Sequence, residues 1–150
     1  MLQYYNDRQK LIQSTMERYK PVSSPSLTYV LVKLPCYSQT YMNNSGKVLP
    51  SLLKQGLNAK NIVVVHDELE KPFGVVDVKQ GGSHRGHNGL RSLMEFCGQD
   101  FTRIRCGIGR PVHKEDVADY VLTVFSEPKD AVEAMINKAI VTIEQLVAQQ

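Results

Sequence analysis

The sequence predicts a single α/β domain in which helices cover the faces of a β-sheet. Three observations predict it. The chain has 150 residues, which fits one domain with a real core. The stretch NIVVVHD (residues 61–67) contains four consecutive apolar residues, typical of a strand covered on both faces. Apolar residues recur at every third or fourth position over 132–147, which predicts a long amphipathic helix.

The N-terminal part is predicted to contain a helix, a linker and the first strand. Residues 2–19 can form a helix, and PVSSPS (21–26) is too short a linker to separate two folded domains. We therefore expect an N-terminal helix and linker over 1–27 and the main domain over 28–150. TYVLVKL (28–34) predicts a strand that ends before the next proline.

The rest of the chain predicts alternating helices and strands. These elements are a broken helix at 38–56, strands at 61–67, 74–79 and 101–109, a helix from Gly89 with Asn88 as N-cap, and a terminal helix with Ser126 as N-cap. In the strand at 101–109, Phe101, Arg103 and Arg105 alternate with Thr102, Ile104 and Cys106. One side of this strand is expected to be basic and the other largely apolar.

The charge of the chain is unevenly distributed. The net charge of +3 is too small to indicate a nucleic-acid-binding protein by itself. Between Lys79 and Lys114, however, seven Lys or Arg residues stand against two acidic residues. A basic patch on a nearly neutral protein suits a polyanionic partner. A merely solvated charged face is the alternative at this point.

Cysteine usage and the N-terminus bear on the compartment. Cys36, Cys97 and Cys106 form no C-x-x-C pair, which favours unpaired thiols in a reducing compartment. No apolar run approaches membrane-spanning length. The N-terminus lacks a signal-peptide core and makes a poor transit peptide. A cytoplasmic or mitochondrial protein is expected, not a secreted one.

The stretch GGSHRGHNGLRS (81–92) reads as a loop that runs into a helix. Its four glycines permit tight turns and a close approach of a ligand to the backbone. The start of the helix near Asn88 would favour an anion, with Arg91 one turn later and Lys79 at the end of the preceding strand. Alternatively, the glycines only form a long turn and Asn88 only caps a helix.

Two further polar clusters are candidates for a site. Asp67, in His66-Asp67-Glu68, lies at the end of a predicted strand, where open α/β sheets bind ligands. It could orient a base, or the cluster could be a salt-bridged strand end. In TYMNNSG (40–46), Asn43 or Asn44 offers an amide to a substrate, unless the segment is only a turn. A metal site of His84, His87 and Asp67 is the least favoured alternative.

Four stretches occur in an order that resembles one family. TYMNNSGK, VVVHDELEKPFG, KQGGSHRGHNGLRSL and FTRIRCGIGRP look like the motifs of bacterial-type peptidyl-tRNA hydrolases, over about residues 28–147. RGHNGLRSL is closer to eukaryotic, often mitochondrial, members. The resemblance implies a twisted mixed sheet between helices and hydrolysis of the ester that joins a peptide to the tRNA 3′ end. It implies tRNA as partner, no metal or other cofactor and no membrane. We expect a monomer.

The resemblance also implies roles for individual residues. Asn43 would contact the substrate and position the water, and Met42 would line the site. Asp67 would hydrogen-bond the catalytic histidine and set its tautomer. Asn88 would bind the peptide side or the attacking water. His87 would help to gate the cleft and meet the tRNA end.

The tRNA itself is expected to be held by cations. Lys79 and Arg105 match positions that grip a tRNA phosphate in the family, and Arg91 is placed with them by its position beside the helix start. Arg105 agrees with the strand pattern as well, because it falls on the predicted basic side.

The largest departure from the family pattern is at the N-terminus. Family members begin with a strand, then G-N-P-G and T-R-H-N, whose histidine is the general base. Residues 1–27 contain neither motif and no histidine, and none of the histidines at 66, 84, 87 and 113 matches the base. The sequence is thus either an N-terminally incomplete version of an active enzyme or a short paralogue that binds tRNA acceptor ends. In both cases this chain is expected to hydrolyse peptidyl-tRNA poorly.

Overall fold

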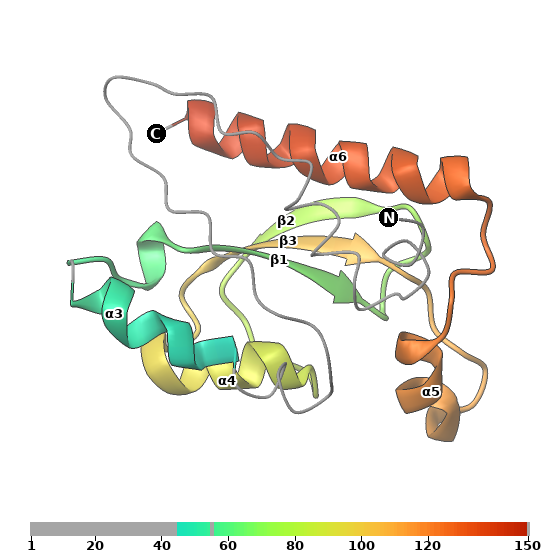
Figure 1. Cartoon of the computed structure of the whole chain (residues 1–150), viewed down its shortest axis with the longest axis horizontal. Helices are drawn as coiled ribbons and strands as arrows, with labels where there is room; N and C mark the ends of the chain where they lie inside the picture. Colours follow the sequence, from blue (N-terminus) through green and yellow to red (C-terminus); the bar gives the residue numbers. More distant parts are fainter. Residues whose placement is uncertain (1–44, 55, 150) are drawn as a thin grey trace. The chain divides into compact units, whose positions relative to one another are not determined.

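The computed structural model describes residues 45–54 and 56–149. The helix, linker and strand expected within 2–34 lie outside the described residues, as do Met42 and Asn43. The described elements follow in chain order (Figure 1): a 3-10 helix Ser45–Val48, α3 Leu49–Leu53, a 3-10 helix Ala59–Asn61, β1 Val63–Glu68, β2 Val76–Gln80, α4 Asn88–Cys97, β3 Thr102–Gly107, a 3-10 helix Lys114–Asp116, α5 Val117–Leu122 and α6 Lys129–Ala148.

The three described strands form a mixed sheet in the order β1-β3-β2. The N–H groups of Thr102 and Ile108 donate to the carbonyls of Ile62 and Glu68. The residue numbers of donor and acceptor differ by the same amount in both bonds, so β3 runs parallel to β1. Gly81 N–H donates to Phe101, and Gly107 N–H donates to Val75. Here the partner numbers have a constant sum, so β2 is antiparallel to β3. The predicted α/β class with a mixed sheet is confirmed.

The described residues divide into two compact units. The first unit comprises 65–77 and 104–149, and the second comprises 45–64, apart from residue 55, together with 78–103. Each strand contributes residues to both units. Each unit also has its own apolar cluster, so local packing holds the polar side chains of each unit in place.

The core of the first unit forms where α6 packs on the strands (Figure 1). α6 contributes buried residues at helical spacing, and β1 and β3 contribute the others; the cluster contains Val65, Ile104, Cys106, Ile108, Val132, Met135, Ile136, Ala139 and Ile143. The predicted terminal helix is confirmed. Its predicted cap is wrong, because α6 begins at Lys129, and the N–H groups of Ala131 and Val132 donate to Pro128 rather than to Ser126. None of the described helices is long and apolar enough to cross a membrane.

The core of the second unit joins α3 and α4 to the start of β3. Leu49, Leu90, Leu93 and Phe101 are its buried members. Phe101 is completely buried, so it anchors the chain as it leaves α4 and enters β3. The glycine-rich loop thus leads into a helix that is packed within its own unit.

Candidate functional site

The glycine-rich loop of the second unit runs from Gly81 to His87 and needs an unusual backbone. Gly81, Gly82 and Gly86 have φ angles of 66°, 101° and 86°, and Arg85 has a φ of 45°. Such values strain side chains other than glycine. The expectation that these glycines permit tight turns is confirmed.

Two histidines stabilise this loop through their ring nitrogens. His84 Nδ1 accepts a hydrogen bond from Gly86 N–H at 3.0 Å, and His87 Nδ1 accepts one from Leu90 N–H at 3.2 Å. His87 is therefore the N-cap of α4. The prediction that Asn88 caps this helix is wrong, because His87 has the extended backbone that a cap requires and Asn88 is already helical.

The side chain that fastens the loop is Arg103 on β3. Its guanidinium donates to the carbonyl of Ser83 at 2.8 Å and to that of Gly82. It also lies 5.0 Å from the centroid of the Phe101 ring, within cation–π range. Only 3% of Arg103 is exposed. Arg103 lies on the predicted basic side of this strand, but it is buried and its charge binds the loop rather than facing solvent. Its position on the same side of the strand as the apolar Phe101 was the available sequence signal.

The remaining side chains of interest in this unit surround the loop. Asn88 and Arg91 are exposed on the first turn of α4, and His87 is half-buried. Lys79 is half-buried, and its Nζ lies close to Gly82, where an added Cβ would be 3.1 Å from it. The structure thus places Lys79 near the end of β2, beside the loop, and His87, Asn88 and Arg91 at the end of the loop and on the helix that follows it.

The end of the TYMNNSG stretch is fixed to α4. The N–H of Gly46 donates to Ser92 Oγ at 2.9 Å. A Cβ at Gly46 would lie 2.1 Å from the Ser92 carbonyl oxygen, so only glycine allows this approach. Asn43 and Met42 precede this anchor, outside the described residues.

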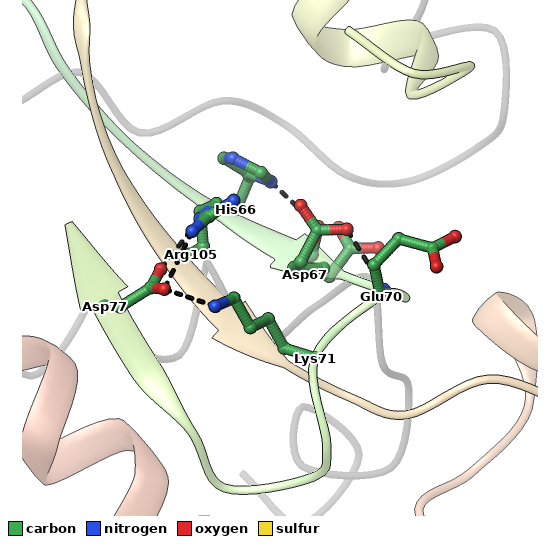
Figure 2. A network of polar contacts seen from close by, with 7 residues as sticks. His66, Asp67, Glu70, Lys71, Asp77 and Arg105 are labelled. Atoms are coloured by element: carbon green, nitrogen blue, oxygen red, sulfur yellow. Dashed lines mark hydrogen bonds and ion pairs between the residues drawn. The ribbon is translucent and has the colours of Figure 1, made fainter. Parts of the chain in front are cut away.

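The polar end of β1 belongs to the first unit. His66 and Asp67 are 2% and 7% exposed. His66 Nδ1 lies 2.8 Å from the carbonyl oxygen of Asp67 (Figure 2). A carbonyl only accepts, so this nitrogen carries the proton and donates. Asp67 and Asn88 belong to different units, and Asn43 lies outside the described residues.

Arg105, also in the first unit, holds an ion pair with Asp77. Figure 2 shows the Asp77 carboxylate between the side chains of Arg105 and Lys71. The hydrogen bond from Arg105, followed by that from Lys71, holds the pKa of Asp77 below its ordinary value although partial burial opposes this; the same bond raises the pKa of Arg105. Sequence reasoning missed Asp77, because its partner lies 28 residues away.

No group of three or more metal-ligating side chains occurs among the residues that the structure describes. Both His84 and His87 use Nδ1 to accept backbone N–H groups. The described part of the chain therefore gives no support to the metal alternative.

Comparison with known proteins identifies the family. The family profile described as peptidyl-tRNA hydrolase matches residues 7–150. The chain belongs to the peptidyl-tRNA hydrolase family. The match begins before residue 28, where the motif resemblance starts.

Individual members of the peptidyl-tRNA hydrolase family agree. The chain is 48% identical over 109 residues to the Aliarcobacter butzleri protein, a match that covers 71% of this chain and 60% of that one. It is 54% identical over 95 residues to the Geobacter sulfurreducens protein, covering 62% and 49%. The chain thus spans about half to three-fifths of these relatives.

A solved structure supports the fold as well. The crystal structure of peptidyl-tRNA hydrolase from Acinetobacter baumannii matches with a TM-score of 0.69 and 29% identity. That match covers 97% of this chain and 85% of the other. The α/β class predicted from the sequence is therefore shared with a solved peptidyl-tRNA hydrolase.

Proposed function

We propose that this chain recognises the 3′ end of peptidyl-tRNA, as part of an enzyme that hydrolyses the ester between peptide and tRNA. The observation that carries the proposal is the donor-rich loop at the start of α4 in a member of this family. Its glycines bring backbone close to a ligand, and the start of the helix favours a negative charge. Arg91 and Lys79 add two cations around the same loop.

Each proposed role is the one that the resemblance to the family implies for that residue, except that of Arg91, which rests on its position beside the helix start. Asn88, exposed at the helix start, would bind the peptide side or the water, and His87 would meet the tRNA end. Asp67 would orient the base, Asn43 would position the water, and Met42 would line the site. Lys79, Arg91 and Arg105 would hold tRNA phosphates. No cofactor is needed for this reaction.

The general base is the weakest part of the proposed machinery in this chain. A base must present an unprotonated ring nitrogen to the attacking water. In His84 and His87 the Nδ1 lone pair already accepts a backbone N–H, so the neutral ring carries its proton on Nε2. His66 is almost completely buried. These contacts count against His66, His84 and His87 as the base, and to that extent they support the alternative function, a tRNA-end-binding protein that hydrolyses slowly.

Hydrolysis is tested with an N-blocked aminoacyl-tRNA as substrate and with the full-length Geobacter sulfurreducens relative as comparator. Losing a general base typically costs about a hundredfold to ten-thousandfold in rate. We expect the 150-residue chain to be at least about a hundredfold slower than the relative. Turnover comparable to that of the relative would contradict this and would indicate a replacement base.

Binding is tested by neutralising Lys79 and Arg105 together. Lys79→Gln/Arg105→Gln should weaken tRNA binding and flatten its salt dependence, because each lost phosphate contact removes about 0.7–0.9 from the slope. The control Lys60→Gln/Lys129→Gln makes the same change of charge at two exposed residues outside the basic stretch from Lys79 to Lys114. Equal affinity and slope in the parent and the first variant would exclude these two cations from the tRNA site.

A further inference from the structure

We propose that Asp77 is an internal competitor for tRNA phosphate: its carboxylate occupies the cations of Lys71 and Arg105 and so limits how tightly the chain binds tRNA. The inference rests on the proposed function, because it takes Arg105 as a phosphate contact. It adds Asp77 as a residue that limits the affinity for tRNA, and it assigns Lys71 to the same phosphate site.

The carboxylate occupies the two-point edge of the guanidinium that Nε and Nη2 form. Arg105 Nε donates to Asp77 Oδ1 and Nη2 donates to Oδ2, each at 2.7 Å. Lys71 Nζ lies 2.6 Å from the same Oδ2 (Figure 2). This two-point geometry is the one by which an arginine binds a phosphate. Asp77 and a phosphate therefore compete for one set of donors.

The cluster is accessible enough for such an exchange. The side chains of Arg105, Lys71 and Asp77 are 16%, 30% and 30% exposed. A buried ion pair would resist opening, because each separated charge would lose its partner without gaining water. Here water and a solute anion can reach the pair, so the contact can open at modest cost.

The charges of the cluster nearly cancel while Asp77 is in place. Lys71 and Arg105 are opposed by Asp77 and by Glu68, which also acts on Arg105 through space. An approaching polyanion thus meets two cations that are already neutralised. Asp77→Asn keeps the shape of the side chain and leaves the cluster with a surplus of one positive charge.

The chain offers a control with the same change of charge. Glu70 pairs with Arg110, and both side chains are more exposed than the Asp77 pair. Glu70→Gln raises the net charge by one, as Asp77→Asn does, but releases Arg110 instead of Lys71 and Arg105. General attraction of tRNA would respond equally to both substitutions, whereas the proposed competition responds only to the first.

The experiment measures binding by the parent, Asp77→Asn, Glu70→Gln and Asp77→Asn/Arg105→Gln over a range of salt concentrations. The probes are deacylated tRNA and inorganic tripolyphosphate. Asp77→Asn should bind tRNA about fivefold more tightly at low salt, the size expected for release of one partly exposed ion pair. Its salt slope should rise by about 0.7–0.9. Glu70→Gln should stay within about twofold of the parent, and the double variant should lose the gain.

The outcomes separate this inference from the proposed function. If the parent binds tRNA but Asp77→Asn binds neither probe more tightly than the parent, the competition is refuted and the proposed function stands. The same holds if Glu70→Gln gains as much affinity as Asp77→Asn. If no variant binds tRNA but Asp77→Asn alone binds tripolyphosphate more tightly than the parent, the cation site stands and the proposed function fails. Circular dichroism checks folding, and Asp77→Ser, which also removes the charge, replaces Asp77→Asn if the latter unfolds.

Discussion

Replacing Arg103 by methionine should both destabilise the second unit and loosen the loop that starts α4. Methionine keeps much of the apolar stem of the side chain but removes the guanidinium. The variant therefore loses two charge-assisted hydrogen bonds, to Gly82 and Ser83, and the contact with the Phe101 ring.

The magnitude follows from these contacts. Hydrogen bonds to charged groups are worth about 1.5–3 kcal/mol each, so the gross loss is about 3–6 kcal/mol. Two effects reduce it. Gly82 is half-buried and Ser83 is exposed, so water can replace Arg103 at their carbonyls, and removing a buried charge relieves its desolvation. We expect the free energy of unfolding to fall by about 2 kcal/mol.

Urea denaturation of the parent, Arg103→Met and Arg103→Lys measures this loss. Arg103→Lys keeps the charge but lacks the two-point fork, so it should lie between the other two. Arg91→Met is the matched control, because Arg91 is exposed; it should change the stability by less than about 0.5 kcal/mol. If Arg103→Met is as stable as Arg91→Met, and the loop amides exchange hydrogen no faster, Arg103 does not hold the loop.

Three further predictions concern packing and titration. Gly46→Ala should cost at least about 2 kcal/mol in urea denaturation, because its Cβ would lie 2.1 Å from the Ser92 carbonyl oxygen; a loss under about 0.5 kcal/mol would contradict that approach. The contacts that lower the pKa of Asp77 stabilise the fold at pH values above the ordinary carboxyl range. This stability is lost as the pH falls through the pKa that Asp77 has in the folded protein. Asp77→Asn should thus cost about 1 kcal/mol at pH 7 and progressively less as the pH falls through the pKa of Asp77 in the folded protein, and a loss independent of pH would refute the ion pair. Burial raises the pKa of Cys106 to about 12, so iodoacetamide at pH 8 should modify it only after unfolding, as mass spectrometry would show.

The sequence by itself determined the order of β1, β2, α4, β3 and α6, the fold class and the family. Four apolar residues in succession at the start of β1 and the helical spacing along α6 predict their elements, because burial imposes its period on the chain. The motifs around Asp67 and Asn88 are short and contiguous, so they were readable without coordinates. The motif resemblance and the family profile agree for this reason.

Only the tertiary structure decided which partner each polar side chain has. Strand alternation put Arg103 and Arg105 on one predicted basic side, yet their partners lie 20 to 28 residues away along the chain. Alternation specifies a face, whereas a partner depends on which distant segment packs against it. Likewise, the side chains of His87 and Asn88 can both cap a helix. Which of them is the N-cap depends on the residue at which the backbone turns helical, and the conformation of the whole loop determines that residue. Arg103 thus fastens a loop and Arg105 holds Asp77, although the sequence alone presents them as two equivalent cations.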